Sequence, residues 1–283
     1  MRRAILLWAL APVLSHAGLT TDLRTAWHAP RAAAFAQAAA DLSPALEAYC
    51  AATTPAVAEE ALHQSRQRWH ATLRPWETLA AVAIGPVLER RAQRQFDFTP
   101  TRPKLIQQAI AAAPADLKAL ESIGTPAKGL PALAWLLWTQ PAEPASPACA
   151  YAAWVAREVA YEARLLADAA WPAQDDATAL AELVNQWVGG AERLRWYGLE
   201  MPTRVALTSK GQQAPDYPRV EAKAEALAWA AQWAGLRELA VGQVSLTSAL
   251  RARGKTKQAA ALANQVKQLD AALNGLQPGQ TAR

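Results

Sequence analysis

The sequence predicts an all-α fold, and three features of its composition support this. Hydrophobic residues make up 52% of the 283 residues, with Ala and Leu abundant among them. Only 13 residues are glycine, and runs of β-branched residues are few. Alanine and straight-chain residues lose little conformational freedom in a helix, whereas β-branched residues lose more. We therefore expect helices throughout, in one large domain or two small ones.

The first 17 residues have the layout of a secretory signal peptide. Arg2 and Arg3 precede an apolar run over residues 4–14, and Ser15-His16-Ala17 then gives a small-x-small cleavage signal. This run is too short to span a bilayer, and no later stretch has the roughly 18 uninterrupted apolar residues that a membrane-spanning helix needs. We expect cleavage after Ala17. The mature protein should be periplasmic and without a lipid anchor, because no cysteine lies near that site.

Proline and capping residues divide the first half of the chain into helices. A helix over 31–51 is expected to kink near Pro44, and Thr54-Pro55 then provides an N-cap and a proline at the first helical position. That helix should end near residue 74, because Pro75 follows. Gly85-Pro86 starts another helix after a break. The loop over 96–103 leads to helices at about 104–113 and 114–122.

The second half begins with Gly129 and a short apolar helix, which we expect to be deeply buried. A proline-rich loop over 139–147 separates it from a long helix over 148–171. Asp175-Asp176 caps a helix that reaches about residue 195. Residues 198–218 contain three prolines and are predicted to be the longest irregular region. The last two helices are expected over 218–251 and 255–274.

Three segments together resemble the imelysin-like family, periplasmic or lipid-anchored bacterial proteins associated with iron uptake. Gly129-Leu-Pro-Ala-Leu-Ala-Trp-Leu-Leu-Trp138 resembles the helix that carries the family's GxHxxE motif, with Pro131 at the histidine position and Ala134 at the glutamate position. A Trp-rich helix followed by Gly85-Pro86 is the second similarity. The third is the proline-rich loop followed by a helix that starts with Cys149.

The resemblance implies two packed helical bundles with a cleft between them. We expect a signal peptide over 1–17, an N-terminal bundle over 18–124 and a C-terminal bundle over 125–283. The degenerate motif and the expected lining of the cleft comprise Gly129, Pro131, Ala134, Trp135, Glu158 and Glu162.

Two cysteines, Cys50 and Cys149, remain after removal of the signal peptide. An even count in an oxidising compartment indicates a disulfide, and cysteines without CxxC spacing are a poor metal or redox site. We predict a Cys50–Cys149 bridge; two buried, unpaired thiols are the alternative.

The residue types on the motif helix argue against metal chemistry there. Histidine and glutamate three residues apart share a helix face and can hold one metal ion, whereas proline and alanine offer no donor atom. Glu60 and His63 form a Glu-x-x-His pair with His70 two turns further on, but a dimetal site needs a second such pair and two more glutamates. A solvated helix face is the simpler interpretation.

Glu162 and Glu158 lie on or beside the apolar face of the helix that follows Cys149. A buried carboxylate needs a partner, and Arg193, Arg195 and Arg219 are the candidates for Glu162. An ion pair between helices is one interpretation, and a ligand-facing carboxylate in the cleft is the other. The many tryptophans are expected mainly to pack the core.

The charge gives little indication of a partner, because the net value is only +5. A basic cluster of Arg251, Arg253, Lys255 and Lys257 could meet phosphate or acidic lipid, but without interleaved aromatic residues we interpret it as a solvated turn. No nucleic-acid partner is expected.

These observations predict an exported binding protein, accessory to bacterial iron acquisition, without cofactor, resident metal or catalytic residues. An iron chelate, haem or an envelope protein would be its ligand or partner. One alternative is a metallopeptidase with a displaced metal site. The other is an envelope scaffold that docks a partner through residues 198–218.

Overall fold

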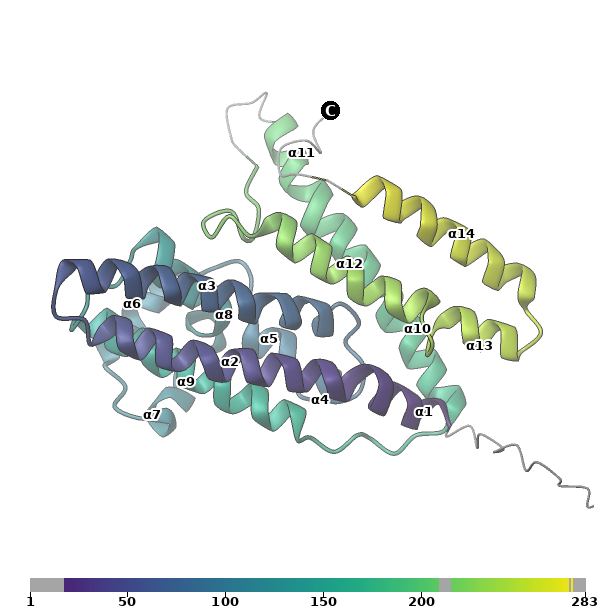
Figure 1. Ribbon diagram of the computed structural model, residues 1–283, viewed down its shortest axis with the longest axis horizontal. Helices are drawn as coiled ribbons and strands as arrows, with labels where there is room; N and C mark the ends of the chain where they lie inside the picture. The colour runs from purple at the N-terminus through teal and green to yellow at the C-terminus, as the bar shows by residue number, and fades with distance from the viewer. Residues whose placement is uncertain (1–17, 209–214, 275, 277–283) are drawn as a thin grey trace, which may run out of the picture.

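The computed structural model describes residues 18–208, 215–274 and 276. Within these residues every regular element is a helix, which confirms the all-α prediction (Figure 1). The expected signal peptide lies outside the described residues. No described helix is long and apolar enough to cross a membrane.

The first cluster of buried side chains is built around three long helices, α2 (Ala29–Cys50), α3 (Pro55–Ala80) and α9 (Pro147–Ala167), which pack side by side (Figure 1). Trp69, Trp76 and Phe35 lie fully buried among them. Shorter elements close the cluster: α4 (Pro86–Glu89), α5 (Ala92–Phe96), α6 (Pro103–Ala112), α7 (Leu117–Glu121), the 3₁₀ turn η2 (Thr125–Ala127), α8 (Gly129–Ala134) and the π-helical turn η3 (Trp135–Thr139).

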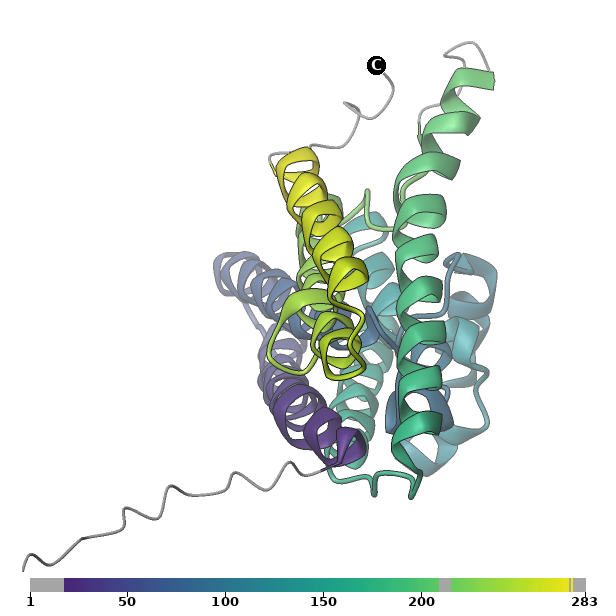
Figure 2. The same ribbon diagram turned by 90° about the vertical axis from the view of Figure 1, so that its right-hand side faces the viewer.

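The second cluster is smaller and lies beside the first. It is formed by α10 (Asp176–Arg193), α12 (Glu225–Val241), α13 (Leu246–Ala252) and α14 (Thr256–Leu273). The first turns of the described chain, α1 (Leu19–Asp22) and η1 (Leu23–His28), add Leu23 and Trp27 to it. The π-helical turn η4 (Leu194–Glu200) and α11 (Met201–Thr208) continue α10 into one long helix that projects beyond the rest of the fold (Figure 2).

The two clusters meet along a seam where α10 and α12 cross the C-terminal end of α3. A Cβ atom on Gly190 of α10 would lie 1.9 Å from the backbone oxygen of Ala81, and one on Gly235 of α12 would lie 2.4 Å from that of Thr78. Only glycine permits such close approach of backbones. The boundary near Gly124 remains a prediction about domains, but the first cluster draws residues from both sides of it.

The disulfide prediction is confirmed, because Cys50 at the end of α2 is bonded to Cys149 in the first turn of α9. The two predicted helix caps are also present: Thr54 accepts a hydrogen bond from the Val57 amide, and Asp175 accepts one from the Thr178 amide. The bridge fixes the start of α9 against α2 in the first cluster.

Three of the predicted helix assignments differ most from the structure. Helix α3 continues through Pro75 to Ala80, because Trp76 and Leu79 pack into the core and offset the hydrogen bond that proline cannot make. The stretch expected to be irregular from residue 198 is helical as far as Thr208, and residues 209–214 lie outside the described residues. The helix expected over 218–251 begins only at Glu225, and it is divided: α12 ends at Val241 and α13 begins after the Ser245 cap.

Candidate functional site

The motif helix α8 is held tightly inside the first cluster. Gly129 has a φ of +74°, a left-handed conformation that favours glycine, and a Cβ there would lie 2.5 Å from the backbone oxygen of Phe96. The indole nitrogen of Trp69 donates a 3.0 Å hydrogen bond to the Leu130 carbonyl. All six residues of α8 are buried. The sequence prediction of a short, buried helix is therefore confirmed.

The expected histidine and glutamate positions on α8 contribute only packing. Pro131 presents a ring, Ala134 a methyl group, and Trp135, which follows in η3, is 4% exposed. Neither Pro131 nor Ala134 has a side-chain atom that could bind a metal ion. This helix face does not fit the metal pair that the resemblance associates with it.

The second metal candidate is not assembled either. His70 places its Nε2 2.9 Å from the backbone oxygen of Ala222, and the side-chain amide of Gln67 lies 3.5 Å from His63 Nε2. Glu60 accepts a hydrogen bond from Gln64. Among the residues that the structure describes, no group of three or more His, Cys, Asp or Glu side chains is arranged to hold a metal ion.

The two glutamates predicted on α9 each form an ion pair. Lys128 donates to Glu158 over 2.6 Å and to the Leu120 carbonyl over 3.1 Å. Burial raises the pKa of Glu158, and the hydrogen bond and charge of Lys128 limit the rise. Glu162 pairs with Arg90 over 2.9 Å. The ion-pair interpretation agrees with the structure, but Arg90 was not among the three expected partners.

Two of those expected partners, Arg193 and Arg219, instead lie in a buried polar cluster at the seam. Arg219 donates to Glu77 on α3 over 3.0 Å and to Asp97, which follows α5, over 2.5 Å. We call the set of Glu77, Asp97, Arg193, Arg219, Glu225 and Gln232 the seam cluster. It joins the end of α3 to the start of α12, and therefore links the two hydrophobic clusters.

Further hydrogen bonds tie the seam cluster to the backbone. The backbone N–H of Arg219 donates to the Glu225 carboxyl, and Gln232 donates to Glu77 over 2.9 Å. Arg193 reaches across from α10 and donates to the Ala80 carbonyl over 2.6 Å. Elements far apart in the chain are thus held at one point.

Burial controls the protonation of this cluster. Burial raises the pKa of Glu77, against the opposing effect of Arg219. For Glu225, burial raises the pKa to about 7. Two opposing effects act on the pKa of Arg219. Burial lowers this pKa, and the carboxylates of Asp97 and Glu77 raise it. The net effect is an increase, which keeps the guanidinium charged.

The space at the seam cluster is small. A cavity of about 90 Å³ lies among these side chains and is also lined by Thr99, Tyr197 and Trp229. Two buried atoms, Arg219 Nη1 and Asp97 Oδ1, have no hydrogen-bond partner among the residues that the structure describes. The cluster therefore connects structural elements and leaves room for little more than ordered water.

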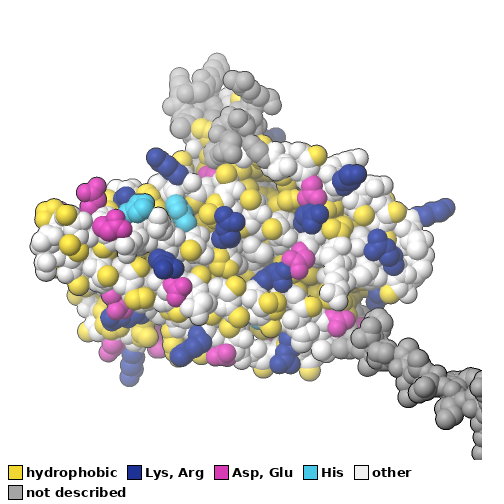
Figure 3. All heavy atoms as spheres, in the orientation of Figure 1, with side chains coloured by type: hydrophobic (Ala, Val, Ile, Leu, Met, Phe, Trp, Pro, Cys, Tyr) yellow, Lys and Arg dark blue, Asp and Glu magenta, His cyan; other side chains and the backbone are white. Residues whose placement is uncertain are grey.

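Sequence reasoning missed Glu77 and Asp97, although one signal was present for the first. Glu77 follows Trp69 and Leu73 at four-residue steps, so the apolar face of α3 carries a carboxylate at its end. Asp97 lies between two phenylalanines in a loop, where no periodicity indicates burial. On the face shown in Figure 3, acidic and basic side chains are interspersed among apolar ones, so the seam cluster is not visible as a charged patch there.

A comparison of the sequence with known families now identifies the chain. The sequence profile of imelysin, peptidase M75, matches residues 28–282. The chain belongs to the imelysin family. No curated protein sequence matches this family member significantly.

Two solved structures share the imelysin fold of this chain. One is an imelysin-like protein from Psychrobacter arcticum 273-4, with a TM-score of 0.74 and 17% identity, covering 93% of this chain and 85% of the other. The second is a putative iron-regulated protein A precursor from Parabacteroides distasonis ATCC 8503, with a TM-score of 0.73 and 12% identity, covering 93% and 86%. At these identities the similarity establishes the fold alone.

Proposed function

We propose that this member of the imelysin family is an exported binding protein that assists bacterial iron acquisition and has no peptidase activity. Family membership supports the assignment. One structural neighbour is described as a putative iron-regulated protein A precursor. The export signal and periplasmic location remain part of the proposal, because residues 1–17 carry them.

The single observation that carries the proposal is the composition of α8. Where the family motif has a histidine and a glutamate, Pro131 and Ala134 are buried and lack donor atoms. A catalytic metal site needs protein ligands and an open position for water or substrate, and α8 offers neither. Binding without metal-dependent hydrolysis is the function that this arrangement supports best.

The size of the seam cavity restricts where a ligand would bind. Pockets for drug-sized ligands usually occupy about 300–1,000 Å³. The seam cavity of about 90 Å³ is too small for haem or an iron chelate. Such a ligand, or a partner protein, would bind another surface of this chain.

Growth and peptidase assays test the proposal together. A strain lacking the gene should grow more slowly when a chelator limits iron, and the wild-type gene should restore growth. Purified protein should not cleave peptides in a manner sensitive to a chelator. Normal growth of the deletion strain when a chelator limits iron would contradict the role in iron acquisition. Peptide cleavage that a chelator inhibits would favour the metallopeptidase with a displaced metal site.

An envelope scaffold is the second candidate, and the projecting helix favours it. Tyr197 is 56% exposed, Met201 38% and Leu207 59%, all on η4 and α11. Exposed apolar side chains on a projecting helix are suited to contact a partner. Replacement of Tyr197 and Met201 by serine should abolish capture of an envelope protein if this candidate is correct, and should leave capture unchanged if it is wrong.

A further inference from the structure

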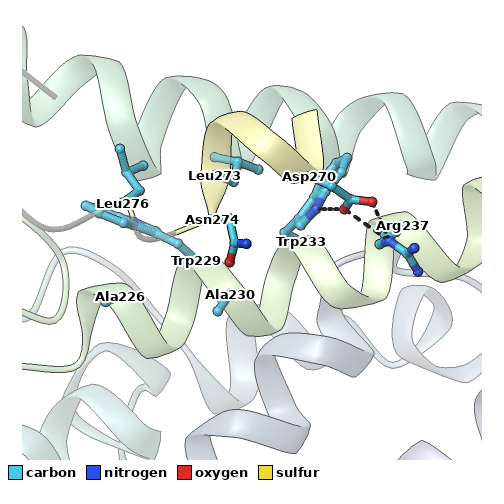
Figure 4. Close-up of a pocket in the computed structure, with 9 residues that line it drawn as sticks. All are labelled: Ala226, Trp229, Ala230, Trp233, Arg237, Asp270, Leu273, Asn274 and Leu276. Atoms are coloured by element: carbon cyan, nitrogen blue, oxygen red, sulfur yellow. Dashed lines mark hydrogen bonds and ion pairs between the residues drawn. The ribbon is translucent and has the colours of Figure 1, made fainter. Parts of the chain in front are cut away.

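A groove between α12 and α14 has the size and lining of a small-molecule site. Its volume is about 490 Å³, within the usual range for ligand pockets. Figure 4 shows that α12 supplies one wall and the C-terminal end of α14, with Asn274 and Leu276, supplies the other. None of the residues predicted from the sequence to line a cleft takes part.

Aromatic and small side chains alternate along the α12 wall of this groove. Trp229 and Trp233 are one helical turn apart, and Ala226 and Ala230 lie between and beside them. In Figure 4 the amide of Asn274 lies between the two indoles. Trp229 is only 4% exposed and Trp233 is half-buried, so Trp233 presents most of the aromatic surface of the groove. The alanines leave the groove open where larger side chains would fill it, so a flat apolar body can lie against the Trp233 indole.

One end of the groove is polar and has unused donors. Arg237 donates through Nε to both oxygens of Asp270, over 3.0 and 2.9 Å, and Trp233 donates to the same carboxylate over 2.8 Å. Asp270 is therefore already bonded on both oxygens. The terminal amino groups of Arg237 donate to no residue that the structure describes, and the side chain is 51% exposed. A planar guanidinium with free amino groups is well suited to bind a carboxylate.

Spacing along α12 sets the length of a suitable ligand. Trp233 and Arg237 are four residues apart, or about 6 Å along the helix axis, and Trp229 lies about another 6 Å away. An acid with two or more fused rings can reach from the indoles to the guanidinium.

We propose that the groove between α12 and α14 binds a flat aromatic carboxylate, with its rings against Trp233 beside the buried Trp229 and its acid group on Arg237. This site is separate from α8, and it adjoins the seam cavity at Trp229, which lines both. It does not depend on a role in iron acquisition, because the proposed ligand need not carry a metal.

Calorimetric titration of the full mature chain with 2-naphthoate tests the proposal, with neutral 2-naphthamide and flexible decanoate as comparison ligands. We expect saturable binding of one 2-naphthoate per chain. Binding of both comparison ligands should be at least about tenfold weaker, because one lacks the charge and the other the rings. No binding of 2-naphthoate, or equal binding of 2-naphthamide, would overturn the proposal, and equal binding of decanoate would overturn the aromatic preference.

Two matched variants locate the site. Arg237→Gln should weaken 2-naphthoate binding at least about tenfold and leave 2-naphthamide binding unchanged. Arg251→Gln removes an equally positive, exposed side chain from the end of α13 and should have no effect. Circular dichroism should show that both variants remain folded. Equal affinity in Arg237→Gln and the wild-type protein would place the ligand elsewhere and refute the assignment.

Discussion

The helix α8 and the seam cluster show opposite uses of buried residues. On α8, residues expected from the family motif to carry a metal pair are hydrocarbon, and the helix serves as packing for the first cluster. At the seam, five charged side chains from distant parts of the chain face one another, three of them buried (Glu77, Arg219 and Glu225) and two half-buried (Asp97 and Arg193). The difference shows that the polar groups concentrated inside this protein join its two halves, while the motif helix has become part of the scaffold.

The largest loss of stability is expected on removal of the disulfide that joins α2 to α9 in the first cluster, which also contains α8. Cys50 and Cys149 are separated by 99 positions. Closing a loop of that length stabilises the fold by about 4–5 kcal/mol in the chain-entropy model. The double variant Cys50→Ser, Cys149→Ser should lose about this much stability in urea unfolding. A loss under about 1 kcal/mol would show that the scaffold does not depend on the bridge.

Removal of the guanidinium from the seam should have the next largest effect. Arg219→Met leaves Glu77 and Asp97 without their shared partner, and breaking a buried pair in this way costs about 3–5 kcal/mol. Arg195→Met is the matched control, because Arg195 pairs with Glu192 and Glu200 at the surface, where such pairs contribute about 0–1 kcal/mol. Equal losses in the two variants would mean that the seam cluster does not join the halves.

Alanine substitutions at two glycines distinguish the cost of a steric clash around α8 from the cost of backbone strain alone. Gly129 and Gly254 have φ values of +74° and +71°, but a Cβ would meet the Phe96 backbone at the first and nothing within 4 Å at the second. Gly254→Ala should cost about 1–2 kcal/mol from strain. Gly129→Ala should cost about 2–4 kcal/mol, because the clash adds to it. Denaturant midpoints that shift equally would contradict the tight packing of α8.

The last predicted effect is a dependence of stability on pH through Glu225. Its pKa in the folded protein is about 7 against an ordinary 4.5, because it is buried. The folded state therefore holds the proton more strongly, and stability falls as pH rises from about 4.5 to 7, by up to roughly 3 kcal/mol.

The variant Glu225→Gln isolates this effect. Burial lowers the pKa of His28 from 6.5 to about 4, so this residue makes stability rise with pH between those values and partly hides Glu225. The difference in unfolding free energy between wild type and Glu225→Gln cancels the His28 contribution. As pH rises from about 4.5 to 7, the variant should become more stable relative to the wild-type protein. A difference that stays constant with pH would show that Glu225 titrates normally.

Local sequence signals predicted much of the fold and little of the seam. Proline and cap residues located most helix starts, and the cysteine count indicated the Cys50–Cys149 bridge. Pro75 was misjudged because core packing outweighed a lost hydrogen bond. Glu77, Asp97 and Arg219 could not be joined from the sequence, because their contact depends on how α12 crosses α3. Arg193 and Arg219 were correctly expected to meet buried carboxylates, but they were predicted as partners of Glu162 and lie instead beside Glu77.

Metal stoichiometry tests most directly the claim that α8 is scaffold. The purified mature protein would be incubated with excess iron or zinc salts, freed of unbound ions and measured by inductively coupled plasma mass spectrometry. We expect far less than one metal ion per chain, because Pro131 and Ala134 supply no ligand. One equivalent of iron or zinc per chain, lost only on treatment with a strong chelator, would contradict the account.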